Sequence, residues 1–159
     1  MSLQGKFDYR RDLPHIQKDN RALFVTFNTH HCLILPESAR TQVLGSCVYE
    51  DGKMIDLEIA VVMPDHVHLI FWPRRNGSGL SYSIPEIMQS IKGASAHRVN
   101  ELLERKGQLW QTESFDHVIR TDENLQAKIE YVRLNPVRRG IVSRPEDYRW
   151  IWERSLPVL

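Results

Sequence analysis

The chain has 159 residues, of which 42% are hydrophobic, and this is enough to build one domain around a single core. The formal net charge is only +1, which excludes a strongly basic protein. Any affinity for nucleic acid therefore has to come from local clusters of positive charge.

The cysteines and the hydropathy pattern restrict the class of protein further. Cys32 and Cys47 fit neither a disulfide framework nor a paired-cysteine metal motif, so we expect two reduced thiols. No apolar run reaches the ~18 residues that a membrane span needs, and no signal peptide is recognisable. We expect a soluble, cytoplasmic protein that does not contact membranes.

The first half of the chain predicts a strand, a helix and a hairpin. Residues 1–20 are polar and mixed in charge, which indicates an N-terminal arm. A β-rich run predicts a strand at 21–29, and apolar residues at helical spacing predict a helix at 37–49. Alternating segments at 53–62 and 66–72 predict two strands joined by a turn at residues 63–65.

The second half predicts two helices and little further strand. A loop at 73–83 precedes a helix capped by Ser83 that runs to about Arg105. Residues 107–121 hold one or two short strands. A last helix, capped by Thr121 or Asp122, ends where Pro136 forbids continuation. Residues 137–159 show few clear elements, and 140–159 are expected to form a C-terminal tail.

These elements predict a single α+β domain over residues 1–159. Their order, βαββαβα, indicates a ferredoxin-like (RRM-like) sandwich, in which helices pack on a mainly antiparallel sheet. The four tryptophans are expected in the core or at its edge rather than as platforms for nucleobases; they are Trp72, Trp110, Trp150 and Trp152.

The segment VVMPDHVHLIFWP, residues 61–73, contains an unusual pair of histidines. Side chains alternate between the faces of a strand, so His66 and His68 share one face, and the apolar residues between and after them form the other. The pair could bind a metal ion, or both imidazoles could simply hydrogen-bond on a half-polar face. Two histidines alone do not make a metal site, because a third ligand is needed.

The last helix presents two polar side chains beside its buried stripe. At about 100° per residue, Leu125, Ile129 and Val132 cluster within roughly 60° and must face inward. Tyr131 and Asn135 lie together on one flank of that stripe. Taken singly, Tyr131 reads as a core-edge residue and Asn135 as a C-terminal cap before Pro136.

Two motifs, MPDHVHL at 63–69 and YVRLNPVRRGIV at 131–142, together resemble the HUH single-tyrosine transposases. The chain is most similar to their REP-associated branch (RAYT), and further family-like segments extend the resemblance over nearly the whole chain. These segments are YRRDLPH, LFVTFNT, LW at 109–110, FDHVIRT and PEDYRW. His117, inside FDHVIRT, is for this reason the most interesting of the remaining histidines.

The resemblance implies a function and a set of site residues. His66, His68 and Asn135 would bind Mg²⁺ or Mn²⁺, and Tyr131, on the C-terminal helix, would be the nucleophile. The substrate would be single-stranded DNA that folds into an imperfect hairpin, cleaved and rejoined through a 5′-phosphotyrosine at REP-type repeats. The protein would then be bacterial and nucleoid-associated when bound to DNA, as a monomer or a homodimer.

Local clusters of positive charge suggest where the DNA phosphates bind. The candidate residues are Arg10, Arg11, Lys92, Arg98, Arg120, Arg133, Arg138 and Arg139. Asp65 stands where relatives often have Asn, and it could cap the turn or add a carboxylate near the metal. The short apolar end RWIWERSLPVL leaves the mode of target recognition open.

Two other functions compete with the transposase. A ferredoxin-like sheet can bind single strands without chemistry, so the chain could be a catalytically inactive or domesticated DNA-binding module. A metal-dependent phosphoesterase would use the histidine pair with acidic ligands, and the sequence offers no clear position for these. The combination of His66, His68, Tyr131 and Asn135 favours the enzyme.

Overall fold

The computed structural model describes residues 21–120 and 124–155. The predicted N-terminal arm, with Arg10 and Arg11, lies outside these ranges. The described strands are β1 (Leu23–Asn28), β2 (Ile55–Val62), β3 (His66–Pro73), β4 (Phe115–Val118) and β5 (Ile151–Glu153). The helices are η1 (His30–Cys32), α3 (Glu37–Tyr49), α4 (Ile84–Leu102), α5 (Leu125–Arg133), α6 (Asn135–Arg138) and η2 (Pro145–Asp147).

The five strands form one sheet in the order β4-β1-β3-β2-β5, and every neighbouring pair is antiparallel. Its first four strands follow the βαββαβ order of a ferredoxin-like fold, with α3 after β1 and α4 after β3. The predicted α+β sandwich is thereby confirmed. Most element boundaries lie within two or three residues of the predicted ones.

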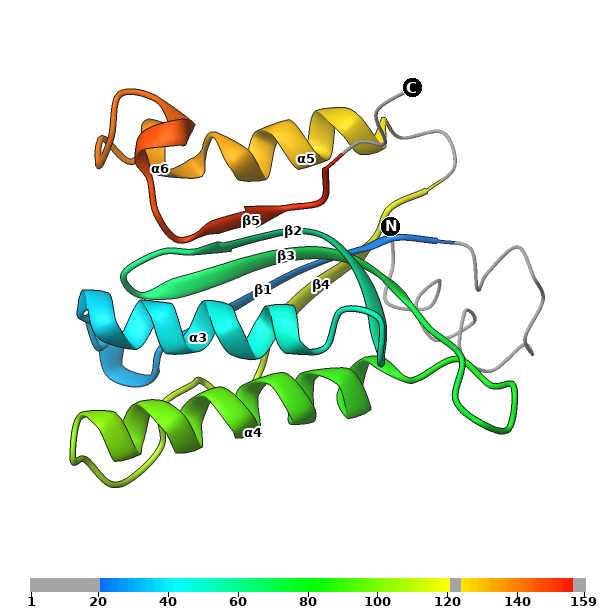
Figure 1. The fold of residues 1–159 in the computed structure, drawn as a ribbon, viewed down its shortest axis with the longest axis horizontal. Helices are drawn as coiled ribbons and strands as arrows, with labels where there is room; N and C mark the ends of the chain where they lie inside the picture. The colour runs from blue at the N-terminus through cyan, green and yellow to red at the C-terminus, as the bar shows by residue number, and fades with distance from the viewer. Residues whose placement is uncertain (1–20, 121–123, 156–159) are drawn as a thin grey trace.

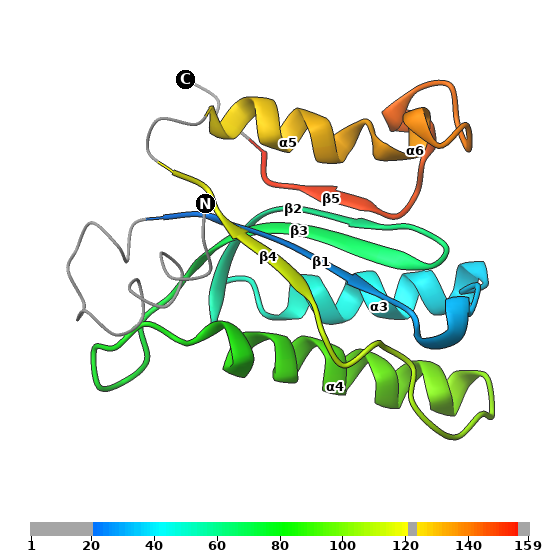
Figure 2. The same cartoon turned by 180° about the vertical axis from the view of Figure 1, so that it is seen from behind.

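The two faces of the sheet are covered differently (Figures 1 and 2). Helices α3 and α4 lie side by side against one face, which we call the closed face, and α5 lies on the opposite side. Val67, Leu69 and Phe71 of β3 are fully buried on the closed face, as their alternation predicts. Helix α5 makes its sheet contacts with β2 and β3, and we call this second face the site face.

The predicted turn between β2 and β3 is confirmed and holds the hairpin closed. Met63 N–H donates to the carbonyl of His66 at 2.8 Å. The buried Thr29 fixes the outside of this turn, because its backbone N–H donates to the carbonyl of Asp65 at 2.9 Å and its hydroxyl to the same oxygen at 3.2 Å. The start of β3 is therefore held from two sides.

The predicted start of the last helix is wrong. Helix α5 begins at Leu125, and its N-cap is Asn124, whose side-chain oxygen accepts the N–H of Ala127 at 3.1 Å. Thr121 and Asp122 precede this cap and lie outside the described residues. The helix ends at Arg133, and Pro136 falls inside the short α6, because its missing N–H interrupts the ladder.

Residues 140–159, expected to form a C-terminal tail, instead include the strand β5. Strand β5 pairs with β2 and so extends the sheet by one strand. Tyr148 and Trp150, both buried, anchor it: the Tyr148 hydroxyl donates to the carbonyl of Val62 at 2.6 Å, and the Trp150 indole to Thr41 Oγ1 at 3.0 Å. Sequence patterning missed this strand because it has only three residues.

The tryptophans and cysteines behave as expected. Trp110 and Trp150 are buried, and Trp72 and Trp152 pack against the core while partly exposed. Both cysteines are free thiols, and burial raises the pKa of Cys47 to about 12. Within residues 21–120 and 124–155, no helix has the length and apolar character to cross a membrane.

Candidate active site

The histidine pair lies on the site face, at the start of β3. The rings of His66 and His68 are 4.8 Å apart between centroids and nearly perpendicular, at 78°. His66 is 5% exposed, whereas His68 is only partly buried. The pair is therefore close enough to bind one ion, and His68 is the more accessible of the two.

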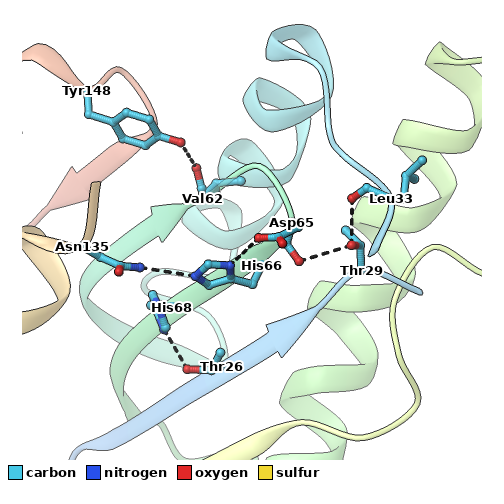
Figure 3. Close-up of polar contacts among 9 residues, drawn as sticks. All are labelled: Thr26, Thr29, Leu33, Val62, Asp65, His66, His68, Asn135 and Tyr148. Atoms are coloured by element: carbon cyan, nitrogen blue, oxygen red, sulfur yellow. Dashed lines mark hydrogen bonds and ion pairs between the residues drawn. The ribbon is translucent and has the colours of Figure 1, made fainter. Parts of the chain in front are cut away.

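Each ring is held by a hydrogen bond to its Nδ1 atom (Figure 3). Nδ1–H of His66 donates to Asp65 Oδ1 at 2.7 Å, and Nδ1 of His68 lies 2.7 Å from the Thr26 hydroxyl. Both rings thus present Nε2 as the atom left to bind a ligand. Partners of this kind fix the tautomer and orientation of metal-binding histidines.

The Asp65 carboxylate accepts from Nδ1–H of His66, on the side of the ring away from Nε2, which is the position of a residue that orients this histidine. Thr26 was not singled out from the sequence. It lies opposite His68 in the β1–β3 register, and that register is fixed by the fold rather than by any local motif.

Asn135 reaches the same site from the other end of the chain. Its side chain is 5% exposed, and Nδ2 lies 3.3 Å from His66 Nε2, although 69 residues separate the two (Figure 3). The reading of Asn135 as a C-terminal cap of α5 is wrong, since Leu134 takes that position and the Asn135 amide points into the sheet. The break before α6 gives it this direction.

The donor set fits a divalent cation. The two imidazole rings are neighbours, and the amide that contacts the His66 ring carries an acceptor oxygen as well as its donor nitrogen. Burial is the main cause, and the charges of His66, Arg138 and Arg139 are smaller causes, that together lower the pKa of His68 to about 3, so the ring is neutral at physiological pH, as a metal ligand must be. Among the described residues, no group of three or more His, Cys, Asp or Glu side chains makes an alternative site.

Tyr131 lies on α5, one turn before Asn135, and its side chain is 54% exposed. The guanidinium of Arg138 lies over its ring, 3.9 Å from the centroid. Arg138 also acts electrostatically on His68, which puts the tyrosine, the arginine and the histidine pair in one neighbourhood. An exposed phenol can reach a bound substrate, which a buried one could not.

The other cations predicted to bind DNA divide into two groups. Arg98, Arg120 and Arg139 have exposed side chains, as does Arg138. Lys92 instead donates to the carbonyls of Gln111 and Thr112 and to Ser114 Oγ, which occupies all three of its ammonium hydrogens. Arg133 makes two bonds to the carboxylate of Glu153, at 2.8 and 2.6 Å, which join α5 to β5.

His117 is not part of the histidine pair. It lies on β4 and is paired in register with Phe24 of β1. Strand β1 lies between β4 and β3, so one strand separates His117 from the histidine pair. His30 and His31 lie in η1, away from β3 in the sequence, and stack on each other at 3.8 Å. Among the six histidines of residues 21–120 and 124–155, His66 is the one hydrogen-bonded to Asn135, and His68 is its neighbour in the pair.

Comparison with known proteins connects this geometry to a family. The family model described as IS200-like transposase matches residues 25–135, a stretch that ends at Asn135 and includes Tyr131 and both histidines of the pair. A REP-associated tyrosine transposase of Escherichia coli is 25% identical over 96 residues, which cover 60% of this chain and 53% of that protein. A Haemophilus influenzae protein that carries the same family name is 27% identical over 92 residues, covering 55% and 52%. The chain thus spans about half the length of the curated relatives it matches.

Solved structures support the fold. A REP-associated tyrosine transposase bound to a REP hairpin superposes with a TM-score of 0.66 at 20% identity, covering 82% of this chain and 75% of that one. A bacterial tRNA(His) guanylyltransferase-like protein in complex with GTP superposes with a TM-score of 0.55 at 14% identity, covering 92% and 74%. At these identities the likeness concerns the fold alone, and the same fold carries different chemistries.

Proposed function

We propose that this chain, which belongs to the IS200-like transposase family, cleaves and rejoins hairpin-containing single-stranded DNA through a 5′-phosphotyrosine intermediate. The observation that carries the proposal is the contact of His66 with both His68 and Asn135, next to the helix that bears an exposed Tyr131. A hairpin substrate is supported by the structural neighbour, which is bound to a REP hairpin.

The nucleophile in this proposal is the Tyr131 hydroxyl. Its oxygen attacks the scissile phosphorus, forming a phosphotyrosine bond while the bond to the 3′ oxygen breaks. The phenolic proton passes to solvent, and the departing 3′ oxygen gains one, which leaves a 3′-OH. Attack by a second 3′-OH on the phosphotyrosine reverses these steps and reseals the strand. The bond energy is kept in the covalent intermediate, so no nucleotide cofactor is needed.

His66, His68 and Asn135 would hold Mg²⁺ or Mn²⁺. The ion would polarise the scissile phosphate and offset its negative charge. All three protein donors are neutral, so they leave the positive charge of the site undiminished for the approach of an anionic strand. Asp65 fixes the orientation and the tautomer of His66, because its carboxylate only accepts, and the Thr26 hydroxyl fixes the orientation of His68.

Arg138 and Arg139 add positive charge at the same place. Both act electrostatically on His68, and Arg138 also lies over the ring of Tyr131. A phosphate between the tyrosine and the histidines would therefore lie in the field of two guanidinium groups. We assign the binding of the scissile phosphate and of the adjacent phosphate to these two arginines. The exposed Arg98 and Arg120 would bind further phosphates of the DNA backbone.

A covalent-adduct assay tests the proposal. Labelled DNA with a REP-type hairpin and single-stranded flanks is incubated with the protein and Mn²⁺, then separated on a denaturing gel. We expect a shifted band that EDTA abolishes and that Tyr131→Phe lacks. Tyr49→Phe is the matched control, because Tyr49 is similarly exposed, at 57%, but lies on α3 at the closed face.

The two competing functions predict different gels. If both the wild type and Tyr131→Phe bind the hairpin tightly and neither gives a band, the chain is a binding module on that DNA. If the strand is cut without a covalent band and Tyr131→Phe still cuts, the reaction is hydrolysis by a metal site. Size-exclusion chromatography with light scattering then decides between a monomer and a homodimer.

A further inference from the structure

A row of aromatic side chains on the site face begins at the edge strand β4 and leads toward the histidine pair. Phe115, the first residue of the edge strand β4, is 59% exposed. Its ring meets Phe24 of β1 edge to face, with centroids 6.1 Å apart and planes at 76°. Figure 2 shows β4 in yellow at the edge of the sheet, beside β1.

This row is continuous with the candidate active site. The Phe24 ring lies 5.7 Å from the ring of His68, so aromatic contacts run from Phe115 through Phe24 to a proposed metal ligand. Phe115 pairs with Thr26, and Thr26 pairs with His68, which puts Phe115 two strands away from that histidine in the same register row. Two strand spacings amount to about 10 Å, a distance that one nucleotide next to a bound phosphate can bridge.

The exposure of Phe115 contrasts with the aromatic residues on the closed face. Phe27, on the same strand as Phe24 but pointing the other way, is fully buried and packs against Trp110 at 4.7 Å. A single exposed apolar residue needs no explanation. Here the exposed ring instead extends a contact series that ends at the proposed reaction centre, in the field of Arg138 and Arg139.

We propose that Phe115, supported by Phe24, is a stacking site for a nucleobase that flanks the scissile phosphate of the single strand. Aromatic rings on a sheet bind unpaired bases by stacking, while the neighbouring cations bind the backbone. In this arrangement the ring would set the position of the strand, and hence of the phosphate, relative to Tyr131. The inference rests on the proposed function, because it deepens the substrate contact of the same site.

Photo-crosslinking tests the proposal without requiring cleavage. Hairpin DNA with thymidine flanks, carrying 5-iododeoxyuridine at one flanking position at a time, is bound to Tyr131→Phe protein with Mn²⁺ and irradiated. The crosslinked residue is then identified by mass spectrometry. We expect a crosslink to Phe115 from one position close to the scissile phosphate. Crosslinks that map only to other residues, with DNA bound, overturn the stacking site.

Binding measurements add a second readout. We expect Phe115→Ala to weaken binding of the flanked hairpin by between about 5-fold and 150-fold, as for the loss of one stacked base. Phe115→Leu, which keeps an apolar side chain, should lose affinity less if the protein remains folded by circular dichroism. Tyr49→Leu removes an equally exposed aromatic from the closed side and should change nothing. Equal affinity for all three variants overturns the stacking site.

The same experiments separate failure of this inference from failure of the proposed function. A wild-type covalent adduct that forms without a Phe115 crosslink overturns the stacking site and leaves the transposase reading intact. If no adduct forms and the hairpin does not bind at all, the proposed function fails, and the stacking site fails with it.

Discussion

The two faces of the sheet use the same strands for different purposes. On the closed face, Val67, Leu69 and Phe71 of β3 are fully buried beneath α3 and α4. On the site face, the intervening His66 and His68 bond to Asp65 and Thr26 and meet Asn135. One β-strand therefore carries both the core and the proposed chemistry, divided by the alternation of its side chains.

This division has a practical consequence. Because alternate residues of β3 face opposite layers, substitutions at neighbouring positions should have separable effects. Substitution of the buried residues on the closed face should lower the free energy of unfolding, and substitution of His66 or His68 on the site face should lower activity at nearly constant stability.

Phe71→Ala tests the closed face. Phe71 is fully buried, so truncation loses its transfer free energy and leaves a cavity, and we expect a loss of about 3–5 kcal/mol in the free energy of unfolding. Urea titration followed by circular dichroism measures it. Trp72→Ala, at the partly exposed neighbouring position of β3, is the control and should cost less. If Phe71→Ala loses less free energy of unfolding than Trp72→Ala, the core of β3 is not confined to the closed face as proposed.

His68→Gln tests the site face. The substitution removes a proposed metal ligand. Loss of a residue that only supports a ligand costs up to about 100-fold in metal affinity or activity, so we expect adduct formation to fall by more than about 100-fold here. The unfolding free energy should change by about 1 kcal/mol, the value of the hydrogen bond to Thr26. Adduct yield and urea titration on the same preparation give both numbers. Retained activity would remove His68 from the metal site.

Asp65→Ala tests the support behind His66. Without the carboxylate, the imidazole loses its fixed orientation, and we expect the affinity for Mn²⁺ to fall by about 10-fold to 100-fold. The Mn²⁺ dependence of adduct formation measures this, and excess Mn²⁺ should restore the yield. Asp56→Ala is the control, because Asp56 pairs on the surface with Arg74 at 2.7 Å. If Asp65→Ala shows an unchanged Mn²⁺ dependence, the contact with His66 has no functional role.

The hairpin of β2 and β3 was predictable because its signals are local. Alternation placed the two histidines on one face, and Met63-Pro64-Asp65 marked the turn. The same periodicity identified the inward residues of α5, of which Ile129 and Val132 are buried. In each case a pattern within ten residues carried the information.

The features that the sequence did not reveal depend on contacts between distant segments. Thr26 supports His68 only because of the β1–β3 register, and β5 exists because Tyr148 and Trp150 anchor a three-residue strand to the edge of β2. Asn124, the helix cap, was missed in favour of Thr121 or Asp122. Asn135 could be placed at the metal from its family resemblance, whereas its approach to His66 follows from the break between α5 and α6.

Arg138 and Arg133 provide the test with the smallest expected effect. The two cations lie close together in the chain but differ in their partners. Arg138 is exposed over Tyr131, so Arg138→Gln should reduce the slope of log affinity against log salt for hairpin DNA by about 1, the effect of one phosphate contact. Arg133 is bound to Glu153, so Arg133→Gln should leave the slope unchanged and cost roughly 1 kcal/mol of stability. Fluorescence anisotropy at several salt concentrations measures the slopes. Equal slopes for the two variants would mean that the Tyr131–Arg138 contact belongs to the fold rather than to the DNA site.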